Sequence, residues 1–325
     1  MQRSGRHSAN YVVSAYPCHM NTVRIGCVKY LNTLPLIEGL RTWEASGGCQ
    51  LMMSAPSGLI GMLERGEVDV ALASVVDAAG PHGHIAHSEQ SKGVVLLPVG
   101  MIGSDGPTMT VRVFSTRPFE EVEEVAVDSD SHTSVALLRV IMWRRYGKRV
   151  RVRTFEVERG SVGRREEEVA LSAAEDRGTS PKGEEGGFEA MLLIGDKVVT
   201  DAPDGALYPH VMDLGAAWKE LTGLPFVYAV WMCRAGEEES MAVRAAAAML
   251  DRSRRHNATR LDWIVEMRAE EKGWEKDAAA EYLGRSLKYA VGEAEREAVE
   301  KFVRWGSEIG VCGGRVVWSG ASQVA

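Results

Sequence analysis

The stretch "SGLIGMLERGEVDVALASVV", residues 57–76, decides the fold class that the sequence predicts. From Ser57 to Arg65 the apolar residues recur with helical spacing, and Ser57 is expected to cap this helix. Gly66 should end it, and the apolar run from Val68 to Val76 has the length and composition of a strand buried in a parallel sheet. Because a strand is also expected at 23–28, the segment reads as a strand–helix–strand unit.

The same alternation continues along the chain. Further strands are expected at 94–99, 109–114, 125–128, 191–194 and 223–233, and helices at 34–44, 131–147 and in four segments from 241 to 309. Strands that alternate with helices, followed by several helices, predict an α/β protein with parallel sheets. The charged, Gly- and Ala-rich segment at about 156–189 is predicted to be a solvated insertion.

Composition limits the classes of partner. The chain has 325 residues, 45% of them hydrophobic, which is enough for one large α/β unit or two lobes. Its formal net charge of -7 offers no global basic field for nucleic acid. Five scattered cysteines without a C-x-x-C pair indicate a reduced, cytoplasmic protein. No apolar run reaches ~18 residues, so no membrane span is expected, and residues 1–21 are expected to be a disordered tail.

Cofactor motifs are missing from the sequence. It contains no G-x-G-x-x-G after a strand, no P-loop, no H-E-x-x-H and no G-x-S-x-G, so neither a nucleotide nor another cofactor is expected. Three histidines, His82, His84 and His87, lie in one loop. A polar surface loop is the favoured interpretation there, because no carboxylate or cysteine clearly completes a metal site.

Polar residues gather where predicted strands end or helices begin. A helix that opens with Ser131, Thr133 and Ser134 presents hydroxyls and free N–H groups to an anion, although a helix cap without ligand explains it equally well. Several such ends in one α/β chain suggest a cleft for a small carboxylated ligand. The residues alone do not separate a binding protein from an enzyme. The other ends are Tyr30-Leu31-Asn32-Thr33, Ala55-Pro56-Ser57-Gly58, Ser104-Asp105-Gly106-Pro107 and Gly195-Asp196. At the first of them, taken alone, a simple helix cap by Asn32 or Thr33 is the favoured alternative.

Seven segments, in order, resemble the chorismate dehydratase family of the futalosine route to menaquinone. They are "IGCVKYLNTLPL", "APSGLIGMLERGEVDVALASVV", "SDGPTMTVRVFS", "VDSDSHTSVALLRV", "LLIGD", "DLGAAWKELTGLPFVYAVW" and "YLGRSLKYAV". The resemblance runs from about Val23 to Trp305. Its most specific parts are "YLNT" and "TGLPFVYAVW".

The resemblance implies an α/β, two-lobed, type II periplasmic-binding-protein-like fold with the ligand cleft between the lobes. Lobe 1 would comprise residues 22–110 and 228–325, and lobe 2 residues 111–227. It also implies the first step of the route, the loss of water from chorismate to give 3-[(1-carboxyvinyl)oxy]benzoate. The expected partner is this small molecule, without cofactor, metal, nucleic acid or membrane; a homodimer is a candidate assembly.

The resemblance assigns catalytic roles to Asn32 and Ser104. Thr110 stands where the family often has Ser, which keeps a hydroxyl, whereas the segment 197–205 departs from the family's small-residue run. The substrate-binding set that we expect is Tyr30, Thr33, Ser57, Gly106, Thr110, Ser131, Thr133, Ser134 and Asp196.

The base that removes the ring proton stays open at this stage. Asp128, Asp196 and His132 are candidates, and a carboxylate of the substrate, held by Asn32 and Ser104, is the alternative we favour. A solute-binding protein of the same fold for a small carboxylate is the rival function, because fold does not decide function. Such a receptor is expected to carry a secretory signal, which we do not find in residues 1–21. A ligand-sensing regulator would need a DNA-binding domain, for which no segment remains.

Overall fold

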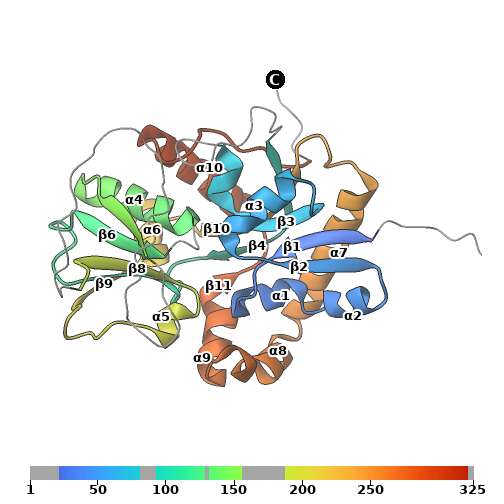
Figure 1. The fold of residues 1–325 in the computed structure, drawn as a ribbon, viewed down its shortest axis with the longest axis horizontal. Coiled ribbons are helices and arrows are strands. Elements are labelled where there is room, and N and C mark those ends of the chain that lie inside the picture. The colour runs from blue at the N-terminus through green and yellow to red at the C-terminus, as the bar shows by residue number, and fades with distance from the viewer. Residues whose placement is uncertain (1–21, 81–92, 129–131, 156–186, 321–325) are drawn as a thin grey trace, which may run out of the picture.

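The computed structural model describes residues 22–80, 93–128, 132–155 and 187–320. The predicted tail, the histidine-containing loop, Ser131 and most of the charged insertion lie outside these residues. The strands form two sheets, each with helices packed beside it (Figure 1). The α/β class predicted from the sequence is confirmed.

One sheet has six strands and the other has five. The order in the first is β11 (Leu287–Lys288), β4 (Val94–Ser104), β10 (Phe226–Arg234), β3 (Val70–Ser74), β1 (Val23–Cys27) and β2 (Cys49–Met53). The order in the second is β7 (Arg151–Phe155), β6 (Glu124–Asp128), β8 (Ala190–Ile194), β5 (Val111–Ser115) and β9 (His210–Asp213). The lobe limits expected from the resemblance remain a proposal.

The sheets are mixed, so the prediction of parallel sheets is wrong in part. β1 pairs in parallel with β2 and β3, but β10 runs antiparallel to both β3 and β4. In the second sheet β5 runs antiparallel to β8 and β9. The physical reason lies in the connections: β4 leads the chain from the first sheet into the second and β10 brings it back, so these neighbours must point in opposite directions.

Helices pack against both sheets. The break between α1 and α2 was not predicted; Gly39 lies there, and a Cβ on it would come within 3.1 Å of Ser253 Oγ of α7. The α-helices are α1 (Leu34–Ile37), α2 (Leu40–Ala45), α3 (Pro56–Glu64), α4 (His132–Tyr146), α5 (Lys197–Thr200), α6 (Leu214–Thr222), α7 (Met241–Ala258), α8 (Leu261–Arg268), α9 (Lys276–Glu281) and α10 (Glu293–Glu308). Short helical turns are η1 (Leu31–Thr33), η2 (Val75–Ala79), η3 (Glu270–Lys272) and η4 (Tyr282–Ser286), the last of π type.

The predicted Ser57 cap of α3 is wrong. The helix begins at Pro56, its N-cap is Ala55, and no side chain caps it. Proline suits this first position because its fixed φ matches the helix and it has no N–H that would need a partner.

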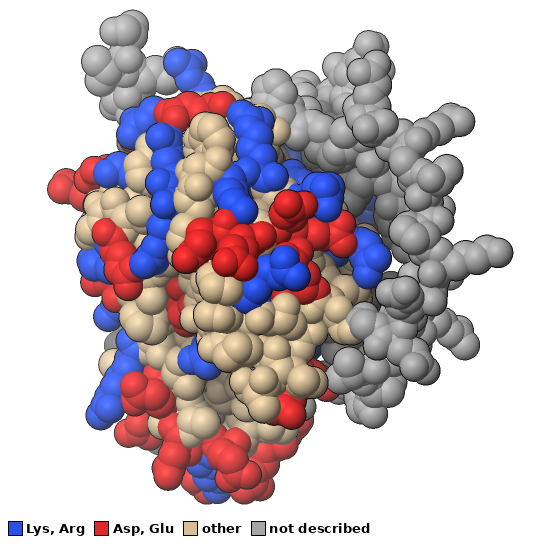
Figure 2. Space-filling model, turned by 90° about the vertical axis from the view of Figure 1, so that its left-hand side faces the viewer, with Lys and Arg blue, Asp and Glu red and all other residues tan. Residues whose placement is uncertain are grey.

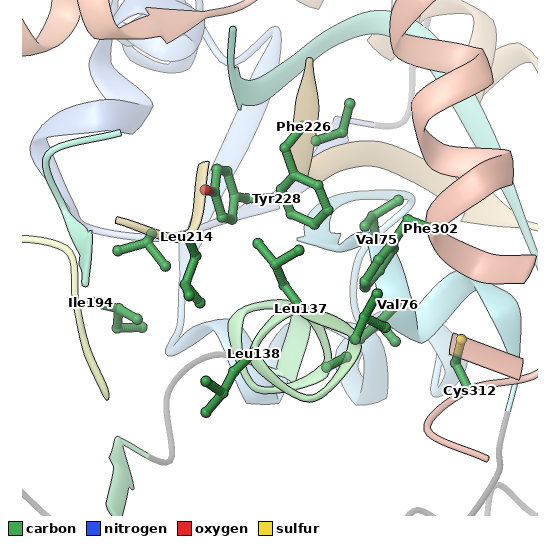
Figure 3. Close-up of a cluster of buried hydrophobic side chains, with 14 of the residues drawn as sticks. Val75, Val76, Leu137, Leu138, Ile194, Leu214, Phe226, Tyr228, Phe302 and Cys312 are labelled. Carbon is green, nitrogen blue, oxygen red and sulfur yellow. The ribbon is translucent and has the colours of Figure 1, made fainter. Parts of the chain in front are cut away.

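One hydrophobic core joins the elements of both sheets. Side chains of α4, η2 and β10 meet in it, among them Leu137, Val75 and Phe226 (Figure 3). Trp218 of α6 and Phe302 of α10 pack edge-on against Phe226, with ring centroids 5.2 and 5.0 Å away. Because this core runs from α4 and β8 to β3 and β10, it stabilises the arrangement of the two sheets.

Charged residues of both signs share the surface of the protein, and its described cysteines lie inside. Figure 2 shows Lys and Arg mixed with Asp and Glu on the end of the molecule that carries the five-stranded sheet. The four described cysteines, Cys27, Cys49, Cys233 and Cys312, are buried and unpaired, and burial raises the pKa of Cys27 to about 12. Among the described residues, no helix combines the length and apolar character that crossing a bilayer requires.

Candidate active site between the two sheets

A small cavity lies where the two sheets face each other. Its volume is about 80 Å³. Tyr30, Asn32 and Pro56 line it from the segments that follow β1 and β2. Thr110 and Gly195 line it from turns beside β5 and β8, and Tyr228 and Tyr282 from the later part of the chain. Ligand pockets usually measure ~300–1,000 Å³, so the cavity in this structure is smaller than a typical small-molecule site.

A hydrogen-bond network centred on Tyr282 forms one wall. Asn32 Nδ2 donates to the Tyr282 hydroxyl oxygen at 3.1 Å, and Thr110 Oγ1 donates to the same oxygen at 2.7 Å. The Tyr282 ring is fully buried and stacks on Trp274, with centroids 4.9 Å apart. With two donors on its oxygen, the Tyr282 O–H proton remains for a third partner, and Asn32 keeps a second N–H.

The local backbone explains why Asn32 faces the cavity. After β1 the chain is extended at Tyr30 and then turns into η1, where Asn32 is the middle residue. Neither η1 nor α1 has a side-chain cap, so Asn32 and Thr33 do not cap these helices. The simple cap, which the sequence left open as an alternative, is therefore not what this segment forms.

The end of β4 and the turn that follows it hold a second group of hydroxyls. Ser104 is fully buried, and its Oγ has no hydrogen-bond partner within the described residues. Thr108 Oγ1 lies 3.2 Å from the Tyr228 hydroxyl and 3.0 Å from Asp213 Oδ1. Asp213 also accepts from the backbone N–H groups of Thr108 and Met109 and caps α6. This carboxylate therefore fixes the turn that presents Thr108 and Thr110.

The start of α4 contributes less than predicted. Ser134 lines the cavity, but the Thr133 hydroxyl is buried and accepts from Val76 N at 3.4 Å, pointing toward η2. His132 Nδ1 lies 2.8 Å from Asp77 Oδ1, also of η2. Ser131 lies outside the described residues. The predicted anion site at this helix start thus keeps only Ser134 as a described cavity residue.

Ser104, predicted to be catalytic, does not line the cavity, and four other predicted residues are also absent from its lining. Thr33 is buried and donates to Asn32 Oδ1 at 3.4 Å, and Asp196 Oδ1 accepts from Trp274 Nε1 at 2.8 Å. Ser57 follows the lining residue Pro56, and Gly106 forms a buried turn with a φ of 114°. Their expected roles in substrate binding remain proposals, and the contacts of Thr33 and Asp196 position neighbouring side chains.

Three functional candidates escaped the sequence analysis: Thr108, Tyr228 and Tyr282. All three line the cavity. Their signal was present, because Tyr228 lies in "TGLPFVYAVW", Tyr282 opens "YLGRSLKYAV" and Thr108 lies in "SDGPTMTVRVFS". They were missed because apolar runs around the two tyrosines indicate core positions, and only the fold brings the hydroxyls to the cavity.

The described lining residues include no Asp, Glu, His, Lys or Arg. Burial raises the pKa of Tyr228 and of Tyr282 far above the ordinary value, with nearby hydroxyl and amide groups opposing this effect. Both phenols therefore stay protonated at neutral pH and act as hydrogen-bond donors or acceptors, not as bases. The cavity is therefore uncharged, and its hydroxyl and amide groups, set among apolar side chains such as Leu72 and Ile102, can orient a ligand through hydrogen bonds.

Two sheets with a cavity between them, joined by β4 and β10, place the chain in the class of proteins with a periplasmic-binding-protein-like fold. A solved protein from Archaeoglobus fulgidus has a TM-score of 0.58 at 14% identity and covers 90% of this chain and 99% of its own. The periplasmic aliphatic sulphonate binding protein of Escherichia coli has a TM-score of 0.54 at 15% identity, with 89% and 91% covered. These likenesses show the fold alone.

The family is narrower than the fold. A family model described as "Menaquinone biosynthesis" matches residues 23–172 and 166–308, and the chain belongs to that family. A curated relative, the chorismate dehydratase of Thermus thermophilus, is 26% identical over 292 residues, which are 86% of this chain and 93% of the relative. The family resemblance expected from the sequence motifs is confirmed.

Proposed function

We propose that this protein is a chorismate dehydratase that converts chorismate into 3-[(1-carboxyvinyl)oxy]benzoate and water, the first step of the futalosine route to menaquinone. One observation carries the proposal: the neutral cavity in which Asn32, Thr110 and Tyr282 form a single hydrogen-bond network. The similarity to the Thermus thermophilus chorismate dehydratase supports it. The proposed enzyme is a carbon–oxygen lyase that acts in the cytoplasm.

The reaction needs orientation more than strong acid–base groups. A C–H bond and the C–O bond to the ring hydroxyl break, the proton goes to a base, and the hydroxide leaves and becomes water. The ring becomes aromatic, so the driving force is large. In this proposal the free N–H of Asn32 and the O–H of Tyr282 donate to the substrate, at a carboxylate or at the departing hydroxyl. Ser104 is buried and does not line the cavity, so a similar contact from its hydroxyl would require the site to rearrange.

The composition of the cavity favours a base that belongs to the substrate. Asp196 bonds to Trp274 and His132 to Asp77, and neither residue lines the cavity. The tyrosines that remain there hold their protons at neutral pH because their pKa values are raised. A carboxylate of chorismate, held by neutral donors, would then accept the ring proton.

The deciding experiment incubates the purified protein with chorismate, without added metal or nucleotide. The expected result is a product with the mass of chorismate less one water and with new aromatic absorbance. Addition of a chelator should leave the rate unchanged. Saturable binding of chorismate without turnover would contradict the enzyme and favour a solute-binding protein for small carboxylates. If the chelator abolished chorismate turnover and a divalent ion restored it, the metal-free mechanism would be contradicted.

A further inference from the structure

A second cavity lies on the side of the six-stranded sheet covered by α1, α2, α7 and α8, helices that lie side by side in Figure 1. Its volume is about 460 Å³, within the ~300–1,000 Å³ that small-molecule sites usually occupy. None of its lining residues lines the cavity between the sheets. It is a separate, larger site to which the proposed reaction assigns no role.

Positive charge dominates this second cavity. Four arginines line it, with Glu38 as the acidic residue among its described lining, in a chain of formal net charge -7. Glu38 is buried and already engaged: Arg268 donates to its Oε1 at 2.7 Å, and Arg41 Nε lies 3.4 Å from its Oε2. The other two arginines, Arg252 and Arg260, have no carboxylate within ion-pair distance among the described residues.

The two remaining arginines are exposed, and each lies over an aromatic ring. The Arg252 guanidinium lies 5.8 Å from the centroid of Trp43, and that of Arg260 lies 4.5 Å from the centroid of Trp263. Arg260 Nη1 is also 3.3 Å from His256 Nε2. A guanidinium over the face of an indole keeps N–H groups available, and these groups match the oxygens of a phosphate in paired hydrogen bonds.

The floor of the cavity is polar and built into the fold. Ser253 and Asn257 of α7 are buried there, and Asn257 Nδ2 donates to Leu34 O at 3.4 Å and to Ser253 Oγ at 3.3 Å. Gly39 lets α1 and α2 approach this floor closely, because its missing side chain would meet Ser253 and Asn257. Hydroxyl and amide groups at the base of a basic cavity suit a hydrated or polar ligand better than an apolar one.

We propose that this second cavity binds a phosphate dianion, either free or as the monoester of a small organic molecule, through Arg252 and Arg260. Two guanidiniums without carboxylate partners balance two negative charges, and the planar forks fit the tetrahedral oxygens. Part of the volume would remain for the organic group of a monoester, beside Trp43 and Trp263. The proposal is independent of the reaction at the other cavity.

Isothermal titration calorimetry of the full chain with three probes tests this assignment. Inorganic phosphate represents the free anion, adenosine monophosphate a monoester, and adenosine the organic part without the anion. We expect saturable binding of phosphate or the monophosphate with a Kd of about 1 mM or tighter, and none of adenosine. Tighter binding of the monophosphate would identify the monoester as the ligand; equal binding would identify phosphate itself. No binding of either anion, or equal binding of adenosine, would overturn the proposal.

Charge-neutral variants make the test specific. Arg252→Gln and Arg260→Gln should each weaken anion binding by about tenfold or more, because each removes a charged hydrogen-bond donor. Arg255→Gln is the matched control: it removes the same charge from the same helix, but Arg255 pairs with Asp251 and does not line the cavity. Retained binding in both cavity variants, or the same loss in the control, would contradict a role for these two arginines. A thermal melt of each variant checks that it is folded.

Discussion

Asn32 Nδ2 lies 3.1 Å from the hydroxyl oxygen of Tyr282, a residue 250 positions further along the chain. This contact places an amide from the end of β1 against a buried phenol that no sequence pattern marks as polar. Since Thr110 also donates to that oxygen, the three side chains form one unit. A change in any of them should therefore affect the others.

The first prediction concerns Asn32. Asn32→Asp removes the donor and places a negative charge beside the buried Tyr282 oxygen and an anionic substrate, so kcat/KM for chorismate should fall by roughly 10–100-fold or more. Asn32→Ala removes the donor without adding the charge, so its kcat/KM should fall less than that of Asn32→Asp. Steady-state kinetics measure both. An Asn32→Asp enzyme with the wild-type rate would contradict the proposed contact with substrate.

The second prediction concerns the hydroxyl of Tyr282. Tyr282→Phe leaves the buried donors of Asn32 and Thr110 without their shared acceptor, which should lower the free energy of unfolding by about 1–3 kcal/mol. Turnover should fall as well if the hydroxyl donates to the substrate. Urea unfolding and steady-state kinetics report the two effects.

A matched control for Tyr282→Phe is available a few residues further on. The Tyr289 hydroxyl is buried and has no hydrogen-bond partner among the described residues, so Tyr289→Phe should leave stability unchanged or raise it. Equal losses in the two variants would show that the network around Tyr282 has no special role.

The third prediction concerns pH. The hydrogen bond to Asp77 raises the pKa of His132 above its ordinary value, against an opposing effect of burial. A raised pKa in the folded state means that this pair stabilises the fold fully below a pH of about 6.5 and that the contribution is lost as pH rises through the raised pKa. The difference in unfolding free energy between wild type and Asp77→Asn should therefore be larger at pH ~6 than at pH ~8. A difference that grows with pH would contradict it.

The fourth prediction concerns the base. Asp196→Asn keeps an oxygen that can accept from Trp274 Nε1, so the side chain should stay in place and the protein should remain folded. If a carboxylate of the substrate takes the proton, turnover by this variant should stay within a few-fold of wild type, whereas loss of a true general base costs ~10²–10⁴-fold. A variant that binds chorismate normally but has lost its activity to that extent would identify Asp196 as the base.

The fifth prediction concerns the packing that holds Ser104. A Cβ at Gly215 would lie 2.4 Å from Gly106 O and 2.7 Å from Ser104 Oγ. Gly215→Ala should therefore displace the turn after β4 and cost about 1–3 kcal/mol of stability, with a loss of turnover. Gly205→Ala is the control, because its Cβ would meet no atom within 4 Å. Unchanged stability and turnover in Gly215→Ala would show that the turn can move freely.

The sequence by itself determined the fold class and the family. Alternating apolar runs at 57–76 are a local pattern, and so are the motifs that mark the menaquinone biosynthesis family, so both can be recognised without coordinates. Asn32, which lines the cavity, was marked from the sequence because polar groups at strand ends lie at the edge where α/β proteins bind ligands, whereas Thr110 was marked through the family resemblance.

The tertiary structure alone decided the partners of these residues and the direction of the crossing strands. Tyr282 meets Asn32, and Thr133 turns toward Val76 and away from the cavity, through contacts between segments far apart in the chain. Likewise β10 runs antiparallel to its neighbours because of where the chain returns from the other sheet. Such contacts depend on how whole elements pack, so the spacing of residues along the sequence does not predict them.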